Sequence, residues 1–200
     1  MQRPDLTASP PANTAAMEFL LTRRSRPAKM LRAPAPEPAV LERLLSAAAR
    51  VPDHGKLEPW RFIVLEPPAL ARLAAMTEAR GAALGLEPDR IEKAAATLRD
   101  APLVVAVVAV ERTSDKIPAF EQLLSAGAVC LGLVNAALAQ GFGACWLTGW
   151  PAFDRMFLET GLGLGAHEQI AGFVHIGSCD AIPPERPRPD VAALTTRLDK

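Results

Sequence analysis

The sequence has few of the residues that build disulfide frameworks and metal sites. Its 200 residues include three cysteines and three histidines. No two cysteines form a CxxC pair, and an odd number is a poor basis for a disulfide framework. The histidines lie far apart and show no HExxH pattern, so no metal site is expected. Free cysteines are typical of a reducing compartment, and we expect a cytoplasmic protein.

The chain also has no excess of charge of either sign. Its 22 Lys and Arg residues balance 22 Asp and Glu residues. A neutral chain offers no electrostatic reason to bind nucleic acid or an anionic membrane. The longest apolar stretch, residues 125–139, is shorter than the roughly 20 residues that a bilayer requires. It predicts a buried helix, and we expect neither a nucleic-acid nor a membrane partner.

Several nucleotide-binding and hydrolase fingerprints are missing. Gly161, Gly163 and Gly165 alternate with leucine, do not form GxGxxG, and follow a predicted helix rather than a strand. The Rossmann interpretation therefore fails on both sequence and context. The absence of GxxxxGK[ST] argues against a nucleoside triphosphatase, and the absence of GxSxG argues against an α/β-hydrolase.

Length and composition predict one globular domain. The chain has 200 residues, of which 50% are hydrophobic, enough to bury a sizeable core. Residues 1–16 lack the apolar core of a signal peptide, and we expect a disordered leader there. Residues 17–200 are then a single domain.

The predicted helices and strands do not alternate strictly along the chain. Short apolar runs predict strands at 60–65, 103–110 and 170–177, and a further apolar stretch at 145–148. Helical spacing and length predict helices at 38–50, 67–84, 87–99, 118–140 and 153–160. This order favours a helix-rich α/β or α+β domain. The helix at 118–140 is apolar around its whole circumference, which is typical of a core or of a large dimer interface.

Three segments could carry chemistry. The first is Arg23-Arg24-Ser25, because two guanidiniums and a hydroxyl can grip a phosphate. A solvated helix end explains the same residues, since cations are common there.

The second segment is the loop from Arg50 to Trp60, which brings cations together on a turn braced by prolines. A cation stabilises the negative charge that a reduced flavin carries near N1 and O2. An exposed or hydrogen-bonded histidine is an equal interpretation of His54. Core packing at a strand start is the favoured interpretation of Trp60.

The third segment, residues 139–149, reads AQGFGACWLTG. Its glycines allow a ligand to approach the backbone closely, and backbone amides after Trp146 could bond the polar edge of a ring. A helix end followed by an ordinary strand explains the segment equally well.

Taken in order, these segments resemble the nitroreductase family, and most closely its short bacterial subgroup of NAD(P)H nitroreductases. The resemblance runs from about Met17 to about Gly177. It rests on RRS after a short helix, R-x-P-D-H…E-P-W-x-F, A-P-L-V-V, S-A-G and A-Q-G-F-G-x-x-W. Each motif is weak alone, and the ordered set is specific.

The resemblance implies an α+β nitroreductase-like fold with a central, largely antiparallel sheet flanked by helices. It also implies a homodimer with FMN at the subunit interface. Arg23, Arg24 and Ser25 are implied to bind FMN at the phosphate and the ring edge. Arg50 and His54 are implied to contact FMN as well, and the partner chain is one possible source of His54. Further FMN contacts are implied for Trp146, Leu147 and Thr148. The implied NAD(P)H contact comprises Ala136, Ala137, Leu138, Ala139, Gln140 and Gly141. The flavin is the redox centre, so no catalytic side chain is expected.

The sequence departs from the family pattern at three positions. Lys56 and Glu58 stand where the wider family often has Asn and Gln. Leu147 stands where the subgroup often has arginine, and losing that cation could weaken FMN binding or alter its potential. The family often ends with a basic residue that reaches the phosphate, and Arg186 and Arg188 are candidates for it.

These observations predict an FMN-dependent oxidoreductase. It would transfer hydride from NAD(P)H through the flavin to a small organic acceptor, such as a nitroaromatic or a quinone. Two alternatives stay open: a flavin-binding carrier or sensor without reductase turnover, and a flavin-free dimeric interaction module.

Overall fold

The computed structural model describes residues 11–199 and contains a four-stranded sheet in the order β1-β2-β4-β3. Its strands are β1 (Trp60–Leu65), β2 (Val104–Val110), β3 (Gly143–Leu147) and β4 (Glu168–Gly177). All neighbouring strands pair in antiparallel fashion. The predicted α+β class with a largely antiparallel sheet is thus confirmed. Most of the expected disordered leader, residues 1–10, lies outside the described residues.

The helices follow the predicted order closely. The longer ones are α1 (Thr14–Thr22), α2 (Pro38–Ala48), α3 (Pro67–Ala83), α4 (Pro88–Arg99) and α5 (Ala119–Ala139). Prolines open α2, α3 and α4, where the missing N–H costs no hydrogen bond. Two expectations differ from the structure. Residues 14–16 of the expected leader belong to α1. The helix expected at 153–160 lies at residues 155–162 instead, with π-helical geometry at Phe157–Gly161, and a 3-10 turn at Trp150–Phe153 precedes it.

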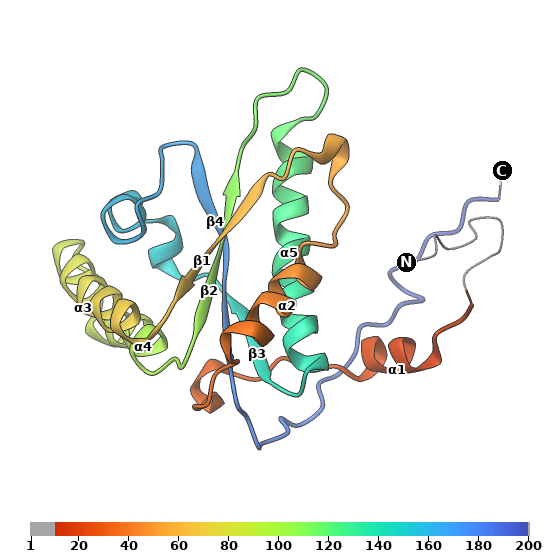
Figure 1. Ribbon diagram of the computed structural model, residues 1–200, viewed down its shortest axis with the longest axis horizontal. Coiled ribbons are helices and arrows are strands. Elements are labelled where there is room, and N and C mark those ends of the chain that lie inside the picture. The colour runs from red at the N-terminus through yellow and green to blue at the C-terminus, as the bar shows by residue number, and fades with distance from the viewer. Residues whose placement is uncertain (1–10, 200) are drawn as a thin grey trace.

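Helices cover both faces of the sheet (Figure 1). Helices α2 and α5 pack on one face, and α3 and α4 pack on the other. The central strand β2 is buried along its whole length. Val105 and Val107 face the α5 side, whereas Val104, Ala106 and Val108 face the α3–α4 side, because successive strand residues point to opposite faces.

Helix α5 is the one helix within residues 11–199 that is long and apolar enough to cross a membrane, judged by length and composition only. The core helix of a soluble protein passes the same test. One side of α5 is buried in the core, with Val129 and Leu133 fully covered, as predicted for this helix. Its other side exposes Phe120, Leu124 and Leu131.

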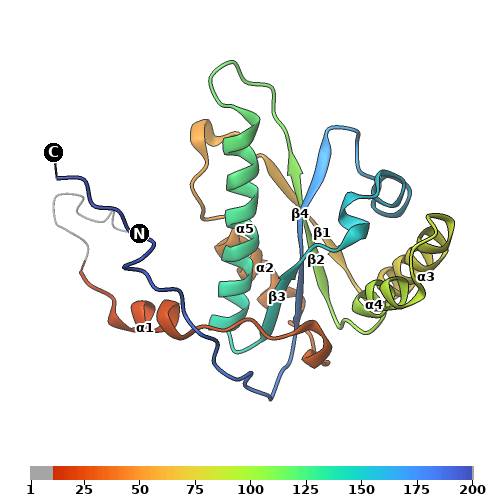
Figure 2. The same cartoon turned by 180° about the vertical axis from the view of Figure 1, so that it is seen from behind.

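Helix α1 and the chain after β4 extend away from the layered body on the same side (Figures 1 and 2). No residue of α1 is buried, and Met17, Leu20 and Leu21 are each more than half exposed. The Arg24 Nη1 atom lies 3.0 Å from the Glu185 carboxylate. This ion pair joins the end of α1 to the proline-rich tail.

The indole of Trp146 packs directly on the backbone of Gly172. A Cβ atom at Gly172 would lie 2.0 Å from Trp146 Nε1, far closer than any real contact. The same Nε1 donates a hydrogen bond of 3.1 Å to the Ala171 carbonyl. Glycine at 172 therefore allows Trp146 to lie flat against β4.

We predict that Gly172→Ala expels Trp146 from this position and breaks the hydrogen bond to Ala171. Overpacking of this kind typically lowers the free energy of unfolding by about 1–3 kcal/mol, which chemical denaturation would measure. Gly127→Ala is the matched control, because its added Cβ would meet Trp146 at an ordinary 3.7 Å. Equal stabilities of the two variants would contradict the prediction.

Candidate functional site

The segment after α1 runs along the edge strand β3. The Arg26 backbone N–H donates to the Ala144 carbonyl at 2.8 Å, which holds residues 23–26 beside the strand. Gly143 makes this approach possible, since a Cβ there would lie 2.6 Å from Leu31 and 3.2 Å from the Arg26 side chain. The motifs Arg23-Arg24-Ser25 and GFGACW, distant in sequence, thus become neighbours.

A cavity of about 730 Å³ lies between these two segments and the tail. We call it the arginine cavity; its charged and hydroxyl-bearing lining residues are Arg23, Arg24, Ser25, Glu185, Arg186 and Arg188. Four guanidiniums face one carboxylate, so the cavity carries a clear excess of positive charge. Arginine offers forked donors that suit phosphate oxygens.

Arg23 has an unmet hydrogen-bonding capacity in this cavity. Its Nη2 donates to Ser25 Oγ at 3.0 Å, but its Nε is buried without a partner. Burial, then Arg188, then Arg24 lower the pKa of Arg23. A buried donor without a partner is costly, and an anion would satisfy it. The residues present therefore fit a phosphate group.

The tail contributes both signs of charge. Glu185 lies 3.0 Å from Arg24 and 3.0 Å from Arg188, and so bridges the α1 end and the tail. A hydrogen bond from the Arg186 backbone, followed by the bond from Arg24, lowers the pKa of Glu185. Arg186 and Arg188 line the arginine cavity, and their contact with a phosphate stays a prediction.

Cys145 also lines the arginine cavity but is not placed to act as a nucleophile. Burial raises the pKa of its thiol to about 11, and the thiolate is the reactive form. Within residues 11–199, no cluster of His, Cys, Asp or Glu could hold a metal ion.

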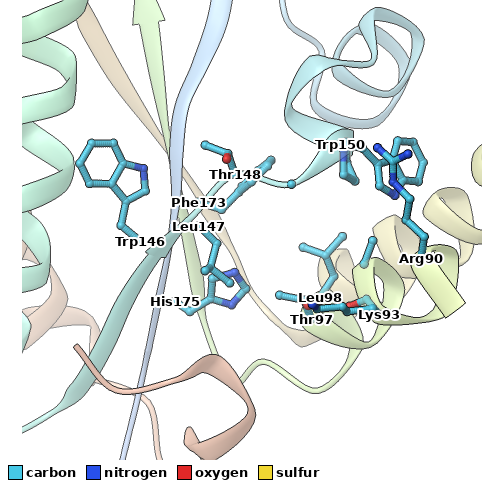
Figure 3. Close-up of a pocket in the computed structure, with 13 residues that line it drawn as sticks. Arg90, Lys93, Thr97, Leu98, Trp146, Leu147, Thr148, Trp150, Phe173 and His175 are labelled. Atoms are coloured by element: carbon cyan, nitrogen blue, oxygen red, sulfur yellow. The ribbon is translucent and has the colours of Figure 1, made fainter. Parts of the chain in front are cut away.

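A second cavity, of about 580 Å³, adjoins the first at Trp146 and Leu147, which line both. We call it the α4 cavity, because Arg90, Lys93 and Thr97 of α4 form one wall. Figure 3 shows Trp146 turned away from α4, whereas Leu147 and His175 lie between β3, β4 and α4. Thr148 lines this cavity but not the arginine cavity.

His175 is a buried imidazole in the wall of the α4 cavity. It is only 1% exposed, and its Nδ1 has no hydrogen-bond partner among the described residues. Burial lowers its pKa to about 4, so the ring is neutral at physiological pH. The sequence pattern had placed His175 only within an apolar strand.

The structure does not bring Arg50 and His54 to either cavity of the same chain. Both are exposed, and His54 Nδ1 lies 2.8 Å from Glu121 in the first turn of α5. Arg23 and Arg24 instead share a small cavity with Leu138 near the end of α5. The stretch of α5 from Glu121 to Leu138 rises by about 25 Å, so His54 lies far from this cavity. Arg50 lies nearer to it, because Ala48 packs on Gly132 in the second half of α5.

Two motif residues shape the loop between α2 and β1. The Asp53 carboxylate accepts hydrogen bonds from the Leu57 and Glu58 backbone N–H groups at 3.2 and 3.0 Å. Ser125 of α5 donates to the Pro52 carbonyl at 2.7 Å. The Asp of R-x-P-D-H and the Ser of S-A-G therefore hold the loop in place.

The backbone of this loop is unfavourable for two of its side chains. Lys56 and Glu58 have φ values of +54° and +47°. Asparagine adopts this left-handed region more readily than lysine or glutamate. An Asn at position 56 would therefore relieve strain that Lys56 bears.

The segment proposed to contact NAD(P)H forms the end of α5 and the turn after it. Ala137 is fully buried, whereas Ala139, Gln140 and Gly141 are exposed. Leu138 and Gly141 line a cavity of about 270 Å³ together with Arg23 and Arg24. Any contact with a nicotinamide cofactor here would come from the exposed residues and the cavity wall.

Sequence reasoning missed the residues that α4 contributes. Arg90 and Lys93 lie one helical turn apart on α4, a spacing that places them on one face, but their charge suits a solvated surface equally well. Trp150 follows the recognised motif by one residue. Only the folded structure shows that these residues surround one cavity.

Comparison with known proteins identifies the fold and its family. The family model for the nitroreductase family matches residues 20–178. The chain belongs to the nitroreductase family. It is 39% identical over 165 residues to a Haemophilus influenzae protein named "Putative NAD(P)H nitroreductase". The aligned region covers 82% of this chain and 88% of that protein. The predicted family membership is thus confirmed.

Solved structures agree on the nitroreductase fold. A nitroreductase-like protein from Bacillus cereus superposes with a TM-score of 0.79 at 22% identity, covering 96% of this chain and all of that one. An FMN-dependent nitroreductase from Clostridium difficile gives a TM-score of 0.65 at 18% identity, covering 92% and 99%. At these identities the likeness establishes the fold. The roles assigned to individual residues remain predictions.

The buried His175 makes stability depend on pH. Its pKa is about 4 in the fold, against an ordinary value of 6.5. Between these values the unfolded chain binds the proton and the folded chain does not. We predict that the free energy of unfolding falls as pH drops from 6.5 to 4, by at most about 1.4 kcal/mol per pH unit.

His175→Phe should remove this slope between pH 6.5 and 4.5, measured by urea denaturation across that range. Glu168 is no confounder there. Its hydrogen bond with Arg61 lowers the pKa of its carboxyl from 4.5 to about 2, so the stability that it contributes is lost only below 4.5. An unchanged slope in the variant would contradict the prediction.

Proposed function

We propose that this protein binds FMN and uses it to transfer hydride from NAD(P)H to a small organic acceptor. The observation that carries the proposal is the arginine cavity, with its excess positive charge and the unpartnered Nε of Arg23. Arg23, Arg24 and Ser25 would hold the phosphate, together with Arg188 of the tail. The family relationship and the name of the Haemophilus influenzae relative support this activity.

The second part of the site is the strip from Trp146 to Thr148. It starts in the wall of the arginine cavity and continues into the α4 cavity. A ring joined to a phosphate in the first cavity would therefore lie along this strip. FMN, when bound, supplies the redox chemistry; the protein orients the ring and sets the charge around it.

The site is proposed to be completed by a second copy of the chain. His54 contacts Glu121 at the start of α5, about 25 Å along the helix from Leu138, which lies beside Arg23 and Arg24, too far for one cofactor to contact both places in one chain. A two-fold axis across α5 would place the start of one α5 beside the end of the other. The exposed Phe120, Leu124 and Leu131 of α5 supply apolar surface for such an interface.

The activity has a direct spectroscopic test. The purified protein, or the apoprotein mixed with FMN, should be yellow, and anaerobic NADH or NADPH should bleach the flavin absorbance. Sedimentation of the same sample should give twice the mass of one chain. A protein that FMN cannot reconstitute would refute the proposal. A yellow protein that nicotinamide does not bleach would instead favour a flavin carrier or sensor.

Replacing both arginines of the motif tests the phosphate site. We predict that Arg23→Ala/Arg24→Ala weakens FMN binding at least about a hundredfold, since each charged hydrogen bond contributes about 1.5–3 kcal/mol. Quenching of FMN fluorescence would measure the Kd. Stability should change little, because the Arg24–Glu185 pair is partly exposed and such pairs contribute little.

Arg43→Ala is the matched control, an exposed arginine on α2 that lines neither cavity. The flavin-free alternative makes the opposite prediction for the double variant. Under it, only stability or dimerisation would change, and flavin retention would not depend on Arg23 and Arg24.

A further inference from the structure

Two residues that line the α4 cavity carry buried polar nitrogens without partners. Trp150 Nε1 and His175 Nδ1 are both buried and make no hydrogen bond among the described residues. Most buried polar groups are paired, because an unmade hydrogen bond costs about 1–3 kcal/mol. Two such atoms on residues of one cavity wall indicate that a ligand normally meets them.

The charge of the same cavity is one-sided. Arg90 and Lys93 line it from α4, and no carboxylate does. Neither cation takes part in an ion pair within the described residues. The α4 cavity therefore favours a ligand that is negatively charged or becomes so.

The shape and lining of the cavity favour a planar ligand. Its volume is about 580 Å³, within the usual range for small-molecule sites of roughly 300–1,000 Å³. Trp150 and Phe173 supply aromatic surface, on which a ring can stack. Arg90 lines the same cavity as Trp150.

We propose that the α4 cavity binds the oxygen-bearing, electron-rich edge of a planar ring. Arg90 and Lys93 supply positive charge, and Trp150 and His175 supply hydrogen-bonding groups. This inference rests on the proposed function, and two rings share the required chemistry: that of the flavin itself and that of the organic acceptor. Leu147, an apolar residue of β3, lines both cavities. In the α4 cavity the positive charge therefore comes from Arg90 and Lys93 of α4 and not from the side chain of β3.

The test removes the charge of the cavity while leaving the fold intact. The variant Arg90→Met/Lys93→Met changes two exposed side chains, and Arg43→Met on α2 is the control. Two quantities are measured on the FMN-loaded proteins. One is the two-electron reduction potential of the bound flavin. The other is the ratio of KM for 4-nitrobenzoate to KM for nitrobenzene, an anionic and a neutral acceptor of similar size.

The two sources of the ring give different results. If the flavin edge occupies the cavity, the double variant binds the reduced flavin about tenfold more weakly relative to the oxidised form. The potential then falls by about 30 mV and the KM ratio stays constant. If the acceptor occupies the cavity, the KM ratio rises about tenfold and the potential stays constant. A variant that matches Arg43→Met in both measurements overturns the proposal.

Replacing His175 tests the hydrogen-bonding part separately. His175→Leu should change whichever quantity the double variant changes, the flavin potential or the KM ratio, and in the same direction. His175→Asn keeps a polar nitrogen near the position of Nδ1 and should restore part of the wild-type value. A packing role alone would not produce this rescue. Equal values for His175→Leu and wild type would overturn the assignment of His175.

The cavity can also be tested if the protein takes up no FMN and the proposed function fails. Calorimetric titration of the apoprotein with benzoate then measures the cavity alone. Wild-type protein should bind benzoate about tenfold more tightly than Arg90→Met/Lys93→Met. Absence of binding, or equal binding by both proteins, would overturn the proposal independently of the flavin.

Discussion

Helices cover the sheet on both faces, and this burial restricts where a ligand can bind. The central strand β2 is buried along its whole length, because α5 packs on one side and α3 and α4 on the other (Figure 1). The middle of the sheet is therefore covered, and the candidate site lies beside an edge strand. The edge strand β3 is short, and its last two residues, Trp146 and Leu147, are exposed.

Every part of the candidate site depends on that edge. The Arg26–Ala144 hydrogen bond places the two adjacent arginines beside β3, and the glycine at 143 makes room for them. Helix α4 reaches the same edge from the opposite face, where His175 faces it from β4. Two cavities that share Trp146 and Leu147 thus meet along one strip of β3, a geometry suited to a ligand with a charged end and a flat end.

The sequence predicted the elements better than the site. Strand β1 was expected at 60–65 and lies there, and β2 and α3 differ from their predicted ranges by one residue, because runs of valine and helical spacing report burial directly. The order of motifs also identified the family. Arg90 and Lys93 could not be predicted, since a solvated helix face has the same pattern. His175 stands among apolar residues, where only three-dimensional packing shows a cavity beside it.

The ion pair between the α1 end and the tail has a consequence for any anion that enters the arginine cavity. Glu185 already contacts Arg24 and Arg188 at 3.0 Å each, so an anion that takes these guanidiniums must exchange with a carboxylate and not only with water. This carboxylate is attached to the same chain and acts as a tethered competitor, present at a high effective concentration. The measured binding free energy of phosphate would therefore be the free energy of its contacts with the arginines minus that of the Glu185 contacts it displaces. The position of the tail would set the second of these two quantities.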